Sequence, residues 1–242
     1  MCEKNSSHGP NCEKKMNMIR KIFVIGFNKT GTTSIHNLFL NEKIKSAHTV
    51  KPVTNILDKY EAFTDGVHYN FQEYYNKYPE SLFILNTRPL KKWLISRYKH
   101  ACVKPSTQFV NMANSWLKYN KKNMEQVKIW PPNNEITYSW LEEHEYHFKN
   151  VLRFFENKPH QLFIVNIERV GWENKVLEFI KQPTQTEIKS YFYKRDDSEI
   201  DKEQLEQIYS NVKLCLENKG YNGDELLIKD NSFSIAKYNN YL

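Results

Sequence analysis

Three short apolar runs are the clearest pattern along the chain. They are KIFVIG at 21–26, LFILN at 82–86 and LFIVNI at 162–167. Runs of this length that are rich in β-branched residues are typical of strands buried on both faces of a parallel sheet. The sequence therefore predicts three buried strands.

The segments between these runs have the apolar spacing of helices. The predicted helices cover 34–41, 71–78, 93–98, 138–155, 173–180 and 201–217. The last of them is amphipathic, and Gly220 is placed to cap its C-terminal end. Strands that alternate with helices predict an α/β fold, with a mostly parallel central sheet in a three-layer α/β/α arrangement.

The length of 242 residues suits a single domain. Residues 1–18 are polar and are predicted to be a flexible tail, and residues 228–242 a C-terminal tail. The predicted domain therefore spans residues 19–227. No internal repeat is present in the sequence.

The net charge of +7 favours an anionic partner. Nucleic acid, a membrane surface and a phosphorylated or sulfated small molecule all satisfy this requirement, and composition does not choose among them. Aromatic residues make up 14% of the chain, which argues against global disorder. No run approaches the ~20 apolar residues of a membrane helix, and the N-terminus lacks an apolar signal-peptide core. We therefore expect a soluble, cytoplasmic protein without a transmembrane segment.

The four cysteines, at positions 2, 12, 102 and 215, do not form a C-x2-C pair. A zinc site therefore has little support. Cys2, His8 and Cys12 could bind a metal, but a flexible tail is the better explanation for them. We expect no metal centre.

The loop after the first predicted strand, GFNKTGTTS at 26–34, concentrates groups that bind phosphate. We call these residues the phosphate loop. A strand, a loop and a helix follow one another here, so the loop N–H groups and the helix N-terminus can surround an anionic oxygen cluster. Lys29 adds a positive charge. Further hydroxyl donors come from Thr32, Thr33 and Ser34.

The phosphate loop differs from the P-loop of ATP-binding proteins at one decisive position. Gly26 and Gly31 have the spacing of that motif, but Thr32 stands where it has lysine. The only lysine of the loop, Lys29, precedes Gly31. A single phosphate with a transferable group close to Lys29 therefore fits better than a magnesium-bound triphosphate.

The segment FVIGFNKTGTTS at 23–34 resembles the 5′-phosphosulfate loop of sulfotransferases. These enzymes use 3′-phosphoadenosine 5′-phosphosulfate (PAPS) as donor and release the bisphosphate PAP. The resemblance implies a P-loop-like nucleotide-binding fold, no requirement for a metal, and contact between Lys29 and the oxygen that bridges to the sulfuryl group. It also implies that the 5′-phosphate is held by Lys29, Thr30, Gly31, Thr32, Thr33 and Ser34.

A second segment, FILNTRPLKKWLISRY at 83–98, is similar to the 3′-phosphate element of the same family. That element is a strand followed by Arg and, eight residues later, by Ser on a helix, and Arg88 and Ser96 have this spacing. A guanidinium at the carboxyl end of a strand can make a forked contact with phosphate. The alternatives are a surface ion pair for Arg88 and a solvated helix position for Ser96.

A weaker resemblance covers 162–180, where a strand precedes Gly-Trp-Glu and a helix. Trp172 and Phe179 are predicted to be packing residues there. The later basic loop of the family is represented only by Lys194 and Arg195, without the Arg-Lys-Gly form of the cytosolic branch.

The acceptor needs a base, and Asp65 is the first choice because many relatives carry an acidic residue before the second strand. Its other interpretation is an Asx-turn beside Gly66. His48, His68 and Glu61 are the alternatives.

The acceptor is expected to be a small molecule, a carbohydrate or a lipid. Its wall could come from the aromatic and basic residues 91–128, although core packing also explains the aromatic residues. The aromatic candidates are Trp93, Tyr98, Trp116, Tyr119 and Trp130.

The prediction is therefore a PAPS-dependent sulfotransferase that acts on a hydroxyl or an amine. One alternative is a P-loop kinase, but no strand run ends in the aspartate that binds magnesium in such enzymes. Another alternative is a non-catalytic relative that binds phosphonucleotides or nucleic acid. The basic residues form no recognisable nucleic-acid module, so no specific nucleic-acid partner is expected.

Overall fold

The computed structural model describes residues 20–48, 56–102, 134–180, 202–218 and 220. The two predicted tails, most of the proposed acceptor wall, the tail cysteines and the pair Lys194 and Arg195 lie outside these residues.

A five-stranded sheet forms the centre of the molecule, and all of its strand pairs are parallel. The strands are β1 (Ile22–Val24), β2 (Ser46–Ala47), β3 (Ala62–Phe63), β4 (Leu82–Thr87) and β5 (Leu162–Asn166), in the order β2-β3-β1-β4-β5. The three apolar runs supply β1, β4 and β5, so the three predicted strands are confirmed, although the first three residues of β5 are only half-buried. The two shortest strands, β2 and β3, were not predicted.

Each predicted helix corresponds to a helix of the structure. The helices are α1 (Thr32–Asn41), α2 (Phe71–Lys77), α3 (Leu90–Cys102), α5 (Asn134–Phe155), α6 (Trp172–Phe179) and α7 (Lys202–Asn218). A short 3-10 helix, η2 (Pro159–Gln161), precedes β5. The helices α1, α3 and α5 begin two to four residues earlier than predicted. Their first turns contain mainly polar residues, which do not show the apolar spacing from which the helices were predicted.

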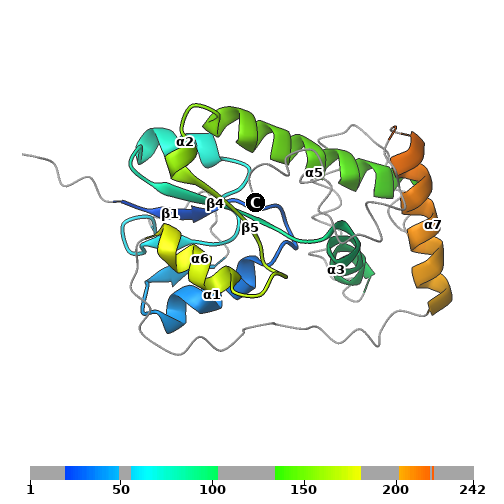
Figure 1. Cartoon of the computed structure of the whole chain (residues 1–242), viewed down its shortest axis with the longest axis horizontal. Helices are drawn as coiled ribbons and strands as arrows, with labels where there is room; N and C mark the ends of the chain where they lie inside the picture. The colour runs from blue at the N-terminus through cyan, green and yellow to red at the C-terminus, as the bar shows by residue number, and fades with distance from the viewer. Residues whose placement is uncertain (1–19, 49–55, 103–133, 181–201, 219, 221–242) are drawn as a thin grey trace, which may run out of the picture.

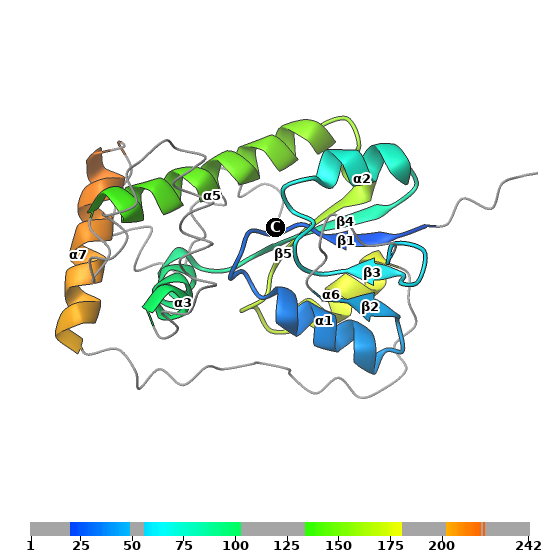
Figure 2. The ribbon, with the colours of Figure 1, turned by 180° about the vertical axis from the view of Figure 1, so that it is seen from behind.

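Alternate residues of the central strands point to opposite faces of the sheet, which produces two hydrophobic cores. Val24 and Ile84 pack with α1 and α6 on one face. Phe23 and Phe83 pack with α2 and α5 on the other. Figures 1 and 2 show the resulting layers, with the sheet between these two pairs of helices. The three-layer α/β/α prediction is therefore confirmed.

The helices α3 and α7 lie at one end of the molecule, beside the amino-terminal part of α5 (Figures 1 and 2). Lys91 of α3 places its ammonium 4.6 Å from the centre of the Tyr209 ring of α7, a cation–π contact. Among the described helices, none combines the length and apolar character that a membrane span requires.

Candidate functional site

The carboxyl ends of the parallel strands meet at one edge of the sheet, which is where open α/β sheets bind ligands. The phosphate loop follows β1 at this edge, and Asp65 follows β3 two residues after the strand ends. Arg88 follows β4 directly. The topology therefore places the three charged residues of the sequence prediction at a common edge.

Asn86 of β4 holds the phosphate loop in shape. The Gly26 N–H donates to Asn86 Oδ1 at 2.9 Å. Asn86 Nδ2 donates to the Thr30 carbonyl at 3.1 Å and to Thr30 Oγ1 at 2.8 Å. The Thr30 hydroxyl also donates to the Phe27 carbonyl, and the residue is fully buried. The Thr30 side chain therefore supports the loop from within.

Gly31 of the phosphate loop is the residue immediately before α1. Its φ of 98° lies in the left-handed region, which favours glycine. A Cβ at this position would lie 2.0 Å from Ile167 Cδ1, so the packing also requires glycine. Among the described residues, no side chain forms a capping hydrogen bond at the start of α1. The first N–H groups of the helix, those of Thr32 and Thr33, therefore face the position that an anion would occupy.

His48 follows β2 and contacts the phosphate loop. Its Nε2 lies 3.3 Å from Thr33 Oγ1, and its Nδ1 lies 3.0 Å from Thr64 Oγ1. Thr64 Oγ1 also donates to the Ala47 carbonyl at 3.4 Å, so it accepts from the Nδ1–H of His48. This arrangement leaves the lone pair of Nε2 directed at the loop hydroxyl.

The charges around His48 influence its protonation. Burial lowers its pKa from the usual 6.5, the negative charge of Asp65 raises it, and the positive charge of Lys29 lowers it further. These interactions place His48, Asp65 and Lys29 in one electrostatic group. The imidazole is therefore predominantly neutral at pH 7.

The other two base candidates occupy different surroundings. Glu61 precedes β3, at the opposite edge of the sheet from the phosphate loop, and its carbonyl accepts from the Ile22 N–H. His68 is 5% exposed and packs edge-on against Phe27. Burial, with the charges of His147 and Arg97, lowers the pKa of His68 to about 3. A group with this pKa is a weak base at neutral pH.

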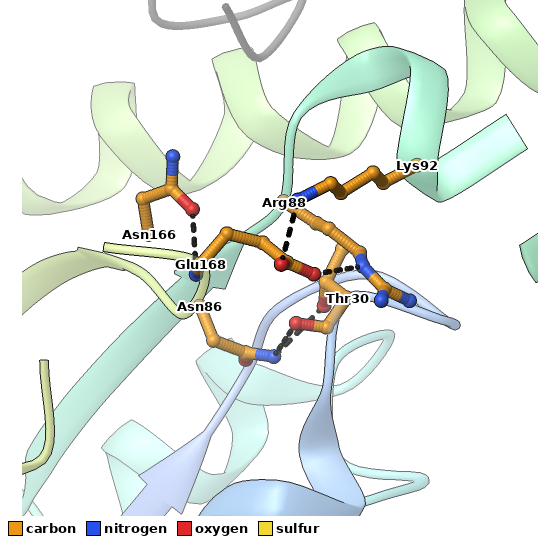
Figure 3. A network of polar contacts seen from close by, with 6 residues as sticks. All are labelled: Thr30, Asn86, Arg88, Lys92, Asn166 and Glu168. Atoms are coloured by element: carbon orange, nitrogen blue, oxygen red, sulfur yellow. Dashed lines mark hydrogen bonds and ion pairs between the residues drawn. The ribbon is translucent and has the colours of Figure 1, made fainter. Parts of the chain in front are cut away.

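Arg88 forms an ion pair with Glu168, which follows β5 (Figure 3). Arg88 Nε lies 2.8 Å from Glu168 Oε1, and Lys92 Nζ of α3 lies 3.0 Å from Glu168 Oε2. Burial raises the pKa of Glu168, but the hydrogen bonds and charges of Lys92 and Arg88 outweigh this and lower it. Two cations therefore share one carboxylate, and the terminal guanidinium nitrogens of Arg88 point away from it in Figure 3.

The remaining predicted residues lie on α3. Ser96 is half-buried on the second turn of the helix. Trp93 is fully buried, and its indole Nε1–H donates to the Asn28 carbonyl of the phosphate loop at 2.8 Å. Trp93 is therefore a support of the loop, whereas Trp116, Tyr119 and Trp130 lie outside the described residues.

Sequence reasoning missed several residues that shape the site. Asn86 carried a usable signal, because a polar residue inside an otherwise apolar strand requires a hydrogen-bond partner. Glu168 and Lys92 carried no such signal, since charged residues near strand and helix ends are common. In the part of the chain described here, no three His, Cys, Asp or Glu side chains are grouped so as to hold a metal.

Residues 38–189 match the model of the family described as "Sulfotransferase domain". A search of curated proteins found no match. The family match covers more than half of the chain and includes His48, Asp65, Arg88 and Glu168. It begins inside α1 and therefore does not include the phosphate loop. The chain therefore belongs to the sulfotransferase domain family.

Proposed function

We propose that this protein transfers a sulfuryl group from PAPS to a hydroxyl or amine of a small-molecule, carbohydrate or lipid acceptor. One observation carries the proposal: the two segments that we expect to bind anions, the phosphate loop and the segment that begins with Arg88, follow the neighbouring parallel strands β1 and β4 at the same edge of the sheet. PAPS has phosphate groups at both ends of its ribose, and two such elements would be needed to hold it. Membership of the family supports sulfuryl transfer in general.

The residues at the edge suit such a donor. The 5′-phosphosulfate would be held by Lys29, by the N–H groups at the start of α1 and by the hydroxyls of the first turn of that helix. Arg88, with Ser96, would hold the 3′-phosphate, and Lys92 adds a second positive charge there. Glu168 occupies only the Nε side of the Arg88 guanidinium. The fork of terminal nitrogens therefore suits a second anion.

The bound donor supplies the sulfuryl group that is transferred. Lys29 stabilises the negative charge that develops on the bridging oxygen as the bond to sulfur breaks. The phosphate loop and Arg88 fix the two ends of the nucleotide, so the acceptor oxygen can approach in line. The acceptor proton then needs a base at the same edge.

Two residues compete for the role of base. Asp65 is the choice from sequence, and it lies near enough to His48 to raise its pKa. His48 contacts the phosphate loop through Nε2, so we propose that this atom receives the acceptor proton. In this arrangement Asp65 stabilises the imidazolium that forms, as a carboxylate beside histidine does in other enzymes.

The donor assignment can be tested by thermal unfolding of the full chain with PAP, AMP and ATP-Mg. At 100 times its dissociation constant, a ligand stabilises by about 2.7 kcal/mol, which corresponds to a rise in Tm of several degrees. We expect PAP to produce this rise and the other two nucleotides to produce much less. A larger shift with ATP-Mg would overturn the donor assignment.

The matched variant Arg88→Lys keeps the charge but removes the fork. In this variant, the rise in Tm with PAP should fall close to the rise in Tm with AMP, which lacks the 3′-phosphate. An undiminished difference between PAP and AMP in this variant would remove Arg88 from the 3′-phosphate site.

A further inference from the structure

Lys29 has a backbone conformation that lysine rarely adopts. Its φ is 70°, in the left-handed region. This region is sterically unfavourable for residues other than glycine, because the Cβ atom comes too close to the following carbonyl oxygen. Such a conformation persists only where the surrounding structure imposes it, and it is concentrated at functional sites. The contacts of the neighbouring residue identify what imposes it here.

The helix α3 holds Asn28, the residue before Lys29, at two atoms. Trp93 Nε1 donates to the Asn28 carbonyl at 2.8 Å, and Arg97 Nη1 donates to Asn28 Oδ1 at 3.1 Å. The Asn28 carbonyl belongs to the same planar peptide group as the Lys29 nitrogen. Trp93 therefore fixes the orientation of the peptide group from which Lys29 continues.

The two donors are themselves fixed by their surroundings. Trp93 is fully buried, and Arg97 is only 7% exposed. The Arg97 guanidinium lies 5.1 Å from the centre of the Trp140 ring and 6.0 Å from that of Phe27. Its Nε has no hydrogen-bond partner among the described residues, although burial of an incompletely paired charge is costly. The burial and the ring contacts of Arg97 therefore restrict its guanidinium to the position from which it contacts Asn28.

We propose that Trp93 and Arg97 are positioning residues that act through Asn28 to direct Lys29 toward the 5′-phosphosulfate. This inference rests on the proposed function. The inference also gives α3 a role at the 5′ end of the donor in addition to its role at the 3′-phosphate, where the helix follows Arg88 and carries Lys92 on its first turn. The same helix therefore sets the groups for both ends of the donor.

A double-mutant cycle with Lys29→Ala and Trp93→Phe tests the inference, with PAP affinity measured by calorimetry on the full chain. Removing the Lys29 ammonium from a charge-assisted contact should weaken PAP binding about tenfold or more. Trp93→Phe keeps an aromatic ring but loses the N–H, and should weaken binding several-fold. In the Lys29→Ala background it should change the affinity less than about twofold, because coupled residues are non-additive.

Two further variants separate positioning from general packing. Asn28→Ala removes the Arg97 acceptor without changing a core residue, and should match Trp93→Phe in both backgrounds. Trp172→Phe changes a buried tryptophan of α6 that packs in the hydrophobic core between α1, α6 and the sheet, and it should leave the affinity within about twofold of wild type. The Tm of each variant shows whether it folds.

The possible outcomes are distinguishable. If wild type binds PAP but the effects of Lys29→Ala and Trp93→Phe multiply, or Trp172→Phe weakens binding equally, the positioning role is wrong while the donor assignment stands. If wild type does not bind PAP, the donor assignment fails and the inference fails with it.

Discussion

At the scale of single residues, His48 is held between hydroxyls from two different segments of the chain. Thr33 belongs to the first turn of α1 and Thr64 follows β3. The ring of His36 stacks on the ring of His48, with the two ring centres 5.2 Å apart. These contacts fix the plane of the His48 ring, so its Nε2 has a defined direction toward the loop.

The pH dependence of turnover should identify the base. If Nε2 of His48 accepts the proton, activity requires the neutral imidazole and falls as the pH drops through a pKa that burial holds below 6.5. Asp65→Asn removes the charge that raises this pKa. The acidic limb of the kcat/KM profile should therefore move to lower pH. His48→Gln should reduce kcat by about 10²- to 10⁴-fold.

The exposed histidine of η2 provides the control for this experiment. His160→Gln should leave both kcat and the pH profile as in wild type. If Asp65→Asn abolishes turnover while His48→Gln retains it, Asp65 is the base and the sequence choice was right.

At the scale of elements, the three apolar runs predicted β1, β4 and β5 well. The strand β4 is buried throughout, whereas β5 is the last strand in the order and its first three residues are half-buried. The strands β2 and β3 have two residues each, too few to show any periodicity. The ion pair between Arg88 and Glu168 could not be predicted from local sequence either, since 80 residues separate the two. It arises from the register of β4 and β5, which places Thr87 opposite Asn166. Contacts set by strand register follow from the fold and not from local sequence.

The starts of α1 and α6 provide a matched pair of glycines. Both Gly31 and Gly171 have positive φ, but only Gly31 has an atom in the path of a Cβ, namely Ile167 Cδ1. Gly171→Ala should therefore cost about 1 kcal/mol of unfolding free energy from the backbone alone. Gly31→Ala should cost about 1–3 kcal/mol more because of the clash. Urea unfolding of both variants measures the difference.

Removal of the clashing atom tests the cause of that difference. Ile167→Val deletes Cδ1, so it should recover part of the loss in the Gly31→Ala background, although it destabilises the wild-type protein by about 0.5–1.5 kcal/mol. If Ile167→Val lowers the unfolding free energy equally in the wild-type and Gly31→Ala backgrounds, packing against Ile167 is not the reason for glycine at position 31.

At the scale of the whole molecule, three histidines are buried together beside the phosphate loop. The rings of His68, His144 and His147 all lie with their centres between 5.6 and 5.7 Å from that of Phe27. Burial is the main cause that lowers their pKa values, to about 3 for His68 and His144 and about 4 for His147. Only His147 has a hydrogen bond to its ring among the described residues, through Nε2 to the Ile25 carbonyl.

This cluster makes the stability of the fold depend on pH. Below pH 6.5 the unfolded chain binds protons that the folded state excludes until pH 3–4, so the unfolding free energy should decrease as the pH falls through this window. Each histidine should contribute about 1 kcal/mol of this loss by pH 5.5.

His144→Phe keeps a ring in the cluster but cannot titrate, so it should make the dependence of urea-unfolding free energy on pH less steep between pH 7 and 5. His160→Gln, exposed on η2, should leave the slope unchanged. A slope that His144→Phe does not alter would mean that carboxylates, and not the buried histidines, set the acid sensitivity of the protein.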